Sequence, residues 1–588
     1  MSDSDRRKSK YNNSYVKALE DQVQRLEAIV ERTKAMYPEV FGQITNSMET
    51  ETASTEHKPE PSDSSRTSYD ESPLIVEESA RGYLGVYGQS SVFVPRQEGL
   101  SDSTANPKVF EEYHDEATLK YISAFFRWHY PDYSIYLYRE AFLTDFFRSQ
   151  DDVKMSLEYC SEALIYAICS VGCRLCDNGH NPTEQSKFYY EKAKDLIFSN
   201  LGKSSHYDIT TIQALLCLAL DDLGRGDNFP AWILSGLAFR IGQHMGFDLD
   251  PARWRSSKSG NLLTDYDAKV RSRIYWGSFV ADRVISLVLG RSSFLRYTES
   301  TIPDSSDLPL LIGIDEFQYI DPSSNDLQVF KVSGPLNKLI SLHTMVDEYK
   351  QQIFGQKKEE RKLSWTDRFK ILAKFNIAIM KWKHNLGGDL SWTRLQLKMD
   401  GSNPNKMSLR YQYYLIILCF NVPFLSNLNH HNLKSELVGS QALCVEVLDD
   451  LYRSILCFRE THGLDKSSLM IVYLAIMATT ALSKLPSKLF KTRTHKHQVH
   501  FHLDVLKQCS SVWGLAKRYC DSLQPVKQSV EGNLPTSTEE SRFSELPKYF
   551  VDEEAFTLDT LLTSVSPSEV FETLPSYFDF MSPEETII

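Results

Sequence analysis

The sequence predicts an all-α protein, with one large multi-helix domain between a short N-terminal coiled coil and acidic segments without regular structure. Between about residues 115 and 525, apolar residues recur at helical spacing over long stretches. Strand-like alternation is scarce there, and no two-residue Asn-Gly turn separates alternating runs. With 588 residues, of which 42% are hydrophobic and 24% charged, the chain has the composition of a soluble globular protein with a sizeable core.

The first 13 residues form a basic N-terminal segment that contains RRKSK at residues 6–10. Such a cluster is typical of a nuclear localisation signal and equally of a solvated terminus. The chain has no apolar segment here that would make a signal peptide. Ten cysteines in 588 residues are too sparse for a disulfide framework, which indicates a reducing compartment.

Residues 14–36 have a heptad period, which predicts a short dimerising coiled coil. Valine takes the a positions and leucine two d positions, the combination that favours two parallel strands. An amphipathic helix packed on its own domain is the alternative, and the a/d pattern favours the coil. The seam residues are Val16, Leu19, Val23, Leu26 and Val30.

Most of the acidity lies in two segments. The formal net charge of the chain is −12, residues 49–113 carry −8 and residues 539–588 carry −10, so the rest is slightly basic. Segment 37–114 is rich in Ser, Thr, Glu, Pro and Gly and lacks an apolar period, which predicts a disordered linker. An acidic total therefore does not exclude a nucleic-acid partner.

The helical domain is expected over residues 115–525, with polar surface connections at 355–370 and 484–502. Residues 467–483 are uncharged and could span a membrane or form a buried helix. Their length and five hydroxyl side chains favour the buried helix. Helical spacing is clearest for Ile212, Leu215, Leu216, Ala219, Leu220 and Leu223, and for Ile233, Leu234, Leu237, Ile241 and Met245.

No catalytic or metal site is evident from the sequence. Phosphate-binding glycine loops, dinucleotide fingerprints, nucleophile elbows and paired-His zinc helices are all missing. Cys173 and Cys176 form a single CxxC inside an apolar helical pattern, whereas structural zinc needs four ligands. The histidines of THKHQVHFH at residues 494–502 are expected in a solvated loop, because no carboxylate or cysteine joins them at ligand spacing. The chain is not expected to be an enzyme.

Several blocks of the helical domain resemble, in order, the middle homology region of fungal zinc binuclear cluster transcription factors. The first is LKYISAFFRWHYPDYSIYLYREAFLTDFF at 119–147, where Tyr130 is inserted between the His and the Pro of the family's turn. Three further blocks follow in order: SEALIYAICSVGCRLCDNG, the block around QALL at 213–216, and SRIYWGSFVADRVISLVLGRSSFLR. Ile302-Pro303-Asp304 then resembles the segment that usually follows the last of these blocks in the family. The resemblance covers about residues 115–430 and implies an all-α regulatory domain.

The family motif residues also have a structural interpretation. Gly236 and Ala238 are expected to let two helices approach closely, and Gly246 fits a helix C-cap. Trp276 is expected to anchor the core, and Arg240, Asp282 and Arg283 to fix helix packing by charge-assisted bonds. A helical domain of this size could also hold an apolar pocket for a small-molecule effector. The motif residues are His129, Pro131, Arg174, Gly236, Arg240, Trp276, Asp282, Arg283, Gly290 and Arg291.

The resemblance implies a zinc cluster upstream of the coil, and this chain departs from it. The family's cluster needs six cysteines to hold two zinc ions, whereas the first cysteine here is Cys160. Zinc ligands and base-reading residues therefore cannot be identified in the chain, and no cofactor is expected in it. An incomplete N-terminus is the favoured explanation, because the coil starts so near Met1; a cluster-less family member is the alternative.

Residues 526–588 have the composition of an acidic activation segment. Aromatic and leucine side chains are interspersed with acids, a pattern that suits docking as a short helix in a coactivator groove. A plain solubilising tail would not need so many aromatics. The residues expected to carry activation are Phe550, Phe556, Leu561, Leu562, Phe571, Tyr577, Phe578 and Phe580.

Together these features predict a nuclear, dimeric transcription regulator that reaches DNA through the missing cluster or through a partner. It would use transcription coactivators and no membrane. The first alternative is a cluster-less interaction protein that dimerises with full-length relatives and modulates them. An all-α enzyme with an unrecognised site is a third possibility, and the lack of convergent catalytic residues counts against it.

Overall fold

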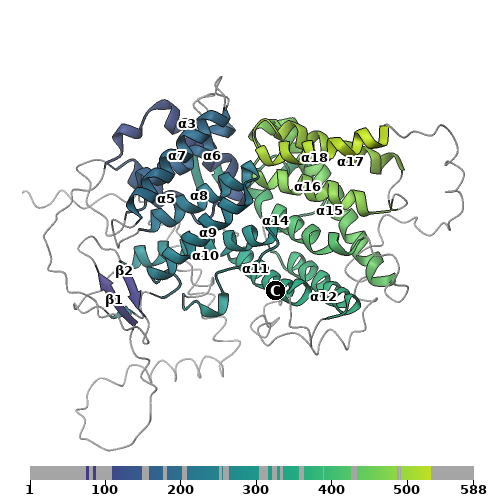
Figure 1. Cartoon of the computed structure of the whole chain (residues 1–588), viewed down its shortest axis with the longest axis horizontal. Helices are drawn as coiled ribbons and strands as arrows, with labels where there is room; N and C mark the ends of the chain where they lie inside the picture. Colours follow the sequence, from purple (N-terminus) through teal and green to yellow (C-terminus); the bar gives the residue numbers. More distant parts are fainter. Residues whose placement is uncertain are drawn as a thin grey trace, which may run out of the picture. The chain divides into compact units, whose positions relative to one another are not determined.

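The fold was examined in a computed structural model of the whole chain (Figure 1). It describes residues 109–148, 158–176, 182–201, 208–250, 264–302, 336–355, 363–387, 390–425, 434–486, 489 and 492–531, and the short segments 74–78, 84–87, 254–255, 316–320 and 327–331. The predicted coil at 14–36 and the predicted activation residues at 550–580 lie outside the described residues.

The described body is built from helices, which confirms the predicted all-α class. In chain order they are α3 (Glu116–Ala124), α4 (Tyr130–Tyr133), α5 (Arg139–Phe146), α6 (Glu162–Gly172), α7 (Pro182–Asn200), α8 (Ile209–Arg225), α9 (Asn228–His244), α10 (Asp265–Val288), α11 (Leu336–Phe354), α12 (Trp365–His384), α13 (Leu397–Asp400), α14 (Pro404–Asn421), α15 (Lys434–His462), α16 (Leu469–Lys484), α17 (Thr492–Cys509) and α18 (Gly514–Glu531). The last helix continues past residue 525, where the sequence placed the end of the domain.

Within the described segments, five short strands accompany the helices. β1 (Leu74–Glu78) pairs antiparallel with β2 (Leu84–Tyr87) and parallel with β3 (Trp254–Arg255), in the order β2-β1-β3. β4 (Glu316–Ile320) and β5 (Leu327–Lys331) form an antiparallel pair. β1 and β2 fall in the segment 37–114 that was predicted to be a disordered linker, so that part of the linker has strand geometry.

The core is centred on α8, α14 and α16. Ile212 to Leu223 on α8 lie in the protein interior, and so does nearly all of α14. α8 begins where the Asp208 carboxylate caps the helix by accepting a hydrogen bond from the Thr211 N–H at 2.8 Å. α14 packs on α4 and α10 on one side and on α15 and α16 on the other, and it lies between the purple–teal and green–yellow helices of Figure 1.

Glycine ends three consecutive helices of the N-terminal half in the same way. Gly226, Gly246 and Gly290 follow α8, α9 and α10 with φ of 84°, 58° and 63°. After α9, the Gly246 N–H donates to Gln243 O and the Phe247 N–H to Gly242 O, which is the hydrogen-bond pattern of a Schellman motif. The predicted C-cap role of Gly246 agrees with this geometry.

Two other glycines mark close crossings, and Gly236 does not. A Cβ on Gly277 of α10 would lie 2.3 Å from the Ile135 carbonyl oxygen, and one on Gly172 of α6 would lie 2.0 Å from the Tyr121 carbonyl oxygen. A Cβ on Gly236 would meet nothing within 4 Å. The expectation that Gly236 permits a close helix approach is therefore wrong for the described residues. Gly172 has that role against α3, and Gly277 lets α10 approach the connection between α4 and α5.

The two predicted surface connections also need correction. Trp365 begins α12, so the end of segment 355–370 is helical. Thr492 begins α17, which takes in the histidine-rich sequence that was expected in a solvated loop. The prediction of a buried helix near residues 467–483 is confirmed, because α16 covers that stretch and most of its side chains are buried. None of the helices in the described ranges combines the length and apolarity that crossing a membrane requires.

Candidate functional site

Two family motif residues of the N-terminal half, His129 and Arg174, contact the connection between α17 and α18. His129 is fully buried, and its ring centroid lies 5.5 Å from that of Phe125 and 5.9 Å from that of Trp513. Burial lowers the pKa of His129 to about 3, so the ring is neutral at pH 7. Pro131 lies in the first turn of α4. The turn predicted at His129 and Pro131 thus lies beside Trp513, in the connection between α17 and α18.

Arg174 connects the same two regions through charge. Its Nε donates to Asp221 Oδ1 at 3.0 Å, and its Nη1 donates to the Val512 carbonyl oxygen at 3.1 Å. Asp221 also accepts from Arg225 Nη2 at 2.5 Å. Since Asp221 is fully buried, the two guanidinium groups supply the compensation that a buried carboxylate requires.

Beside this triad, Asp222 accepts a hydrogen bond from the Tyr190 hydroxyl at 3.1 Å. Burial, and then the neighbouring Asp221 carboxylate, raise the pKa of Asp222 to about 7. The paired acids thus differ in role, because Asp221 faces the arginines and Asp222 faces a phenol.

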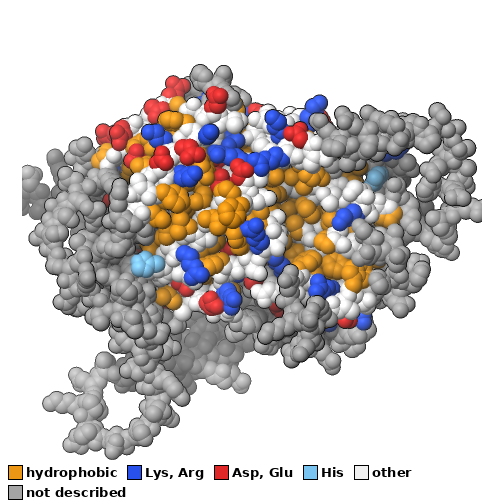
Figure 2. Space-filling view, viewed as in Figure 1, with side chains coloured by type: hydrophobic (Ala, Val, Ile, Leu, Met, Phe, Trp, Pro, Cys, Tyr) orange, Lys and Arg blue, Asp and Glu red, His pale blue; other side chains and the backbone are white. Residues whose placement is uncertain are grey.

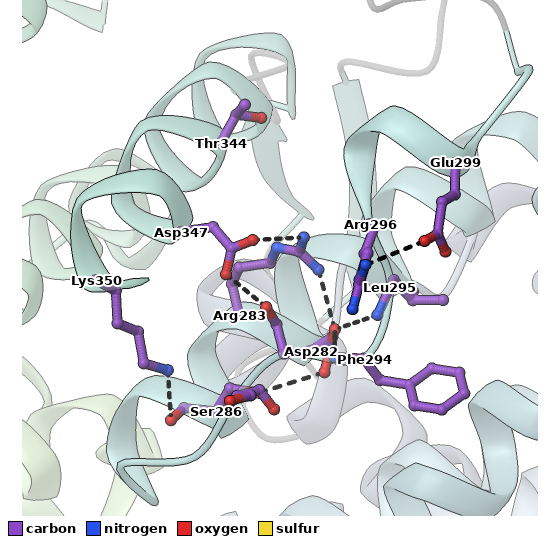
Figure 3. Close-up of polar contacts among 12 residues, drawn as sticks. Asp282, Arg283, Ser286, Phe294, Leu295, Arg296, Glu299, Thr344, Asp347 and Lys350 are labelled. Atoms are coloured by element: carbon purple, nitrogen blue, oxygen red, sulfur yellow. Dashed lines mark hydrogen bonds and ion pairs between the residues drawn. The ribbon is translucent and has the colours of Figure 1, made fainter. Parts of the chain in front are cut away.

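The second charge cluster joins α10 to α11, and Figure 3 shows its contacts. Asp282 Oδ2 accepts from the N–H groups of Phe294 and Leu295, both at 2.8 Å, and from Arg283 Nη1 at 3.0 Å. Arg283 also reaches Asp347 Oδ2 on α11 at 3.5 Å. Burial raises the pKa of Asp282 to about 6, and the Arg283 charge and the two N–H groups oppose that rise.

Lys350 closes the cluster on its other side (Figure 3). Its Nζ donates to the carbonyl oxygens of Ser286 at 2.9 Å and Arg291 at 2.5 Å, at the C-terminal end of α10, where the helix dipole favours a cation. Ser293 Oγ donates to Asp347 Oδ1 at 2.5 Å. Asp282 and Arg283 therefore lie where the sequence analysis expected packing contacts, in a cluster that fixes the loop after α10 against α11.

The remaining motif residues pack on rings. Trp276 is 1% exposed, and its ring centroid lies 5.3 Å from that of Phe279 and 5.6 Å from that of Tyr297. The Arg240 guanidinium lies 5.0 Å from the Phe294 centroid, and the Arg291 guanidinium lies 4.9 Å from the Trp232 centroid. Arg240 thus makes a cation–π contact where a charge-assisted bond was expected.

The cysteine and histidine motifs do not converge on a metal site. Cys173 is buried and Cys176 half-buried at the end of α6. On α17, Gln498 donates to Asp449 Oδ1 at 2.6 Å, and His502 is fully buried with its pKa lowered to about 3 by burial. In the described ranges, no three His, Cys, Asp or Glu side chains come together as metal ligands.

A hollow that sequence reasoning missed lies between α12, α14 and α15. Its volume is about 280 Å³. Its lining comes from three helices and the loop before α13: Met380, Lys383, His384, Ser391, Trp392, Tyr413, Leu443 and Glu446. The one sequence signal available beforehand is the pair of large rings at 392 and 413, which by spacing alone are indistinguishable from core residues.

The face in Figure 2 carries a mixed surface. Apolar side chains gather across its middle, and basic side chains lie among them. Exposed apolar residues of α9 include Phe229, 70% exposed, and Ile233, 50% exposed. Among the described residues of this face, basic side chains lie interspersed with acidic and apolar ones.

Comparisons with known proteins support the family resemblance of the buried motif residues. Residues 122–384 match the model of the fungal specific transcription factor domain. Two transcriptional regulatory proteins of Schizosaccharomyces pombe, both called uncharacterized, are 29% and 30% identical to the chain; the alignments cover 97% and 92% of the chain and 88% and 87% of those proteins.

The TY1 enhancer activator of Saccharomyces cerevisiae is 36% identical over 66% of this chain and 48% of that protein. No solved structure matches the chain. The relatives named here are regulators or activators of transcription, and the similarity to the two Schizosaccharomyces pombe proteins extends over almost the whole chain. The chain therefore belongs to the family of fungal transcriptional regulators that carry the fungal specific transcription factor domain.

Proposed function

We propose that this chain is a nuclear, dimeric activator of transcription. The observation that carries the proposal is its similarity to a transcriptional regulatory protein over 97% of its length. The helical domain acts as a rigid framework, because its buried charge clusters tie helices far apart in sequence to one another. Dimerisation, activation and DNA binding are assigned to the segments on either side of this framework, and the assigned role needs no catalysis.

Activation is assigned to the acidic tail. Residues 530–588, fused to a heterologous DNA-binding domain, should activate a reporter. Changing Phe556, Leu561 and Leu562 to Ala should abolish most of that activity, since these apolar side chains would dock on the coactivator. A matched variant with Ser564, Ser566 and Ser568 changed to Ala should keep it. A silent fusion, together with full reporter activity of the chain lacking the tail, would remove this assignment.

Dimerisation is assigned to the heptad segment 14–36. Leu19→Lys with Leu26→Lys places charges on the seam and should convert the full-length dimer to a monomer, because the d positions face the partner helix. Asp21→Lys with Ala28→Lys places the same charges on the outer face and should leave the dimer intact. Light scattering after size-exclusion chromatography measures both masses. A wild-type monomer, or a dimer in the seam variant, counts against the coil.

DNA binding is assigned to an N-terminal zinc cluster of a longer form, with two zinc ions held by six cysteines. Mapping the 5′ end of the transcript tests this assignment, because an in-frame upstream exon with six cysteines supports it. The second candidate is a cluster-less protein that dimerises with full-length relatives and modulates them. A mapped start at Met1 would select that candidate.

A further inference from the structure

We propose that the hollow between α12, α14 and α15 binds a small organic carboxylate with a flat apolar body. Its walls are two aromatic rings, and a lysine lies at its rim. At about 280 Å³ it falls just below the ~300–1,000 Å³ of sites for drug-sized molecules, so the ligand is of metabolite size. Control of transcription by such a ligand rests on the proposed function, whereas binding itself does not.

The wall formed by Trp392 is held in place before any ligand arrives. Its Nε1–H donates to the Tyr414 hydroxyl at 2.9 Å, and that hydroxyl donates to Asp450 Oδ2 at 3.0 Å. Arg394 Nε donates to Asp450 Oδ1 at 3.1 Å and completes the chain of contacts. A ring oriented by three successive hydrogen bonds does not need to be ordered on binding, which lowers the entropic cost of association.

The second wall is Tyr413. Its ring is nearly perpendicular to Trp392, at 80° with centroids 5.4 Å apart, and it stacks on Trp382 at 16° with centroids 6.1 Å apart. Met380 and Leu443 add apolar surface to the same hollow. Two fixed rings at right angles with aliphatic flanks favour a flat or branched apolar body over an extended polar one.

The charge at the rim selects an anion. Lys383 Nζ lies 5.1 Å from the Trp392 centroid and 5.5 Å from the Tyr413 centroid, so the ammonium lies beside both walls of the hollow. Its nearest acid is Glu446, with Nζ and Oε1 3.5 Å apart, which exceeds the usual hydrogen-bond length. Among the described residues, the Lys383 ammonium donates no hydrogen bond.

Lys383 is also the more enclosed partner of this ion pair. Its side chain is 24% exposed, and that of Glu446 is 35% exposed. An ammonium with three donors, partly removed from water and without a short acceptor, gains most from an incoming carboxylate. Glu446 competes with that carboxylate for Lys383. Loss of the Lys383 charge should therefore lower the affinity for the carboxylate, and loss of the Glu446 charge should raise it.

The test measures binding to the purified full-length chain without DNA, by titration calorimetry and tryptophan fluorescence. The probes are benzoate, indole-3-carboxylate and isovalerate, with benzamide as the uncharged match to benzoate. We expect saturable binding of at least one carboxylate and about 10-fold weaker binding of its amide, the difference that one charged hydrogen bond makes. The absence of saturable carboxylate binding up to ~10 mM would overturn the proposal.

Two rim variants decide the charge of the ligand. Lys383→Met should weaken carboxylate binding about 10-fold or more, and Glu446→Gln should strengthen it about 3-fold, because the competing acid is gone. Lys381→Met, on the same helix but outside the hollow, is the matched control and should bind as the wild type does. Unchanged affinity in Lys383→Met, or weaker binding in Glu446→Gln, contradicts the proposal.

The reporter experiments above are independent of these titrations. Carboxylate binding by a chain whose tail fails to activate would remove the proposed function and leave the site. An active chain that binds none of the carboxylates would keep the proposed function and remove the site.

Discussion

Arg283 compensates two carboxylates at once, which makes it a sensitive position in the α10–α11 cluster. Its guanidinium pairs with Asp282 and Asp347 and lies 3.7 Å from the Phe279 ring centroid. Arg283→Met keeps much of the side-chain volume but leaves Asp282, which is 1% exposed, without its cation. We expect the free energy of unfolding to fall by about 3–5 kcal/mol, measured by urea denaturation.

An exposed ion pair supplies the control for this prediction. Arg296 and Glu299 are 3.4 Å apart, with side chains 67% and 57% exposed. Arg296→Met should change the free energy of unfolding by less than about 0.5 kcal/mol, because water screens the pair. Equal losses in the two arginine variants would show that burial does not set the strength of these contacts.

Asp132 carries a pH dependence of the opposite sense to that of an ion-paired acid. It is buried, with 4% of its surface exposed, accepts a hydrogen bond from Ser468 Oγ, and has its pKa raised to about 7 by burial. Because this folded-state pKa exceeds the unfolded value near 3.9, Asp132 contributes full stability below about pH 4, and that contribution is lost as the pH rises to about 7.

Asp132→Asn mimics the protonated acid and should remove this dependence. The variant should gain stability relative to the wild type as the pH rises from 4 to 8, with a slope of up to ~1.4 kcal/mol per pH unit. Thermal melts over that pH range measure the difference. Asp521→Asn, at an exposed acid, should run parallel to the wild type; a parallel course for Asp132→Asn would mean that Asp132 is ionised when folded.

At the scale of helices, two glycines distinguish a closely packed helix face from an open one. Gly277→Ala puts a methyl group 2.3 Å from the Ile135 carbonyl oxygen, so we expect about 1–3 kcal/mol of destabilisation from overpacking. Gly236→Ala meets no atom within 4 Å, so its better helix propensity should stabilise the protein by up to ~1 kcal/mol. Urea denaturation of both variants measures the contrast; a loss at position 236 would mean that this face is covered.

Apolar periodicity was enough to predict the helices whose buried faces are apolar. α8 contains the apolar pattern from Ile212 to Leu223, and α16 lies at the predicted buried helix near residues 467–483. Both helices were predicted because few polar residues interrupt their apolar patterns. α17 was missed because its inward face includes polar side chains. Gln498 and His502 are 2% and 0% exposed, and the partner of Gln498 is Asp449, 49 residues away. Such compensation depends on tertiary neighbours that a local pattern does not contain.

The candidate sites were predictable to a smaller extent. The resemblance singled out Asp282 and Arg283 as packing residues, but Asp347 and Lys350 entered through the fold, from a helix about 60 residues further on. The hollow was missed because its walls come from helices that approach one another only in three dimensions. A sequence pattern identifies the aromatic residue and the lysine, but not the gap between them.

At the scale of the molecule, the matched domain is smaller than the folding unit. The family match ends at residue 384, but Asp132 and its neighbours depend on later helices. Gln412 Nε2 donates to the Asp132 carbonyl oxygen at 2.5 Å, and Trp513, fully buried, donates to the Ser467 carbonyl oxygen at 2.9 Å. Gly224 of α8 lies directly against the Trp513 ring.

A fragment of residues 122–384 should therefore fail to fold cooperatively. We expect a broad thermal transition and weak near-ultraviolet circular dichroism, because the apolar faces of α4 and α8 lack their cover. Residues 109–531 should give a single sharp transition. Equally sharp transitions, with the same near-ultraviolet signal, would mean that the first half folds alone.

The contact between Arg174 and the Val512 carbonyl oxygen spans 338 positions of the chain. At about 5–20 residues per second, the ribosome needs roughly 17–70 s to synthesise what lies between them. During that interval Arg174 Nη1 lacks the Val512 carbonyl oxygen as its acceptor, and the surface that receives Trp513 is open to chaperones. Premature stop codons anywhere before residue 513 should therefore yield a product for degradation rather than a shortened regulator, and such alleles should behave as complete losses.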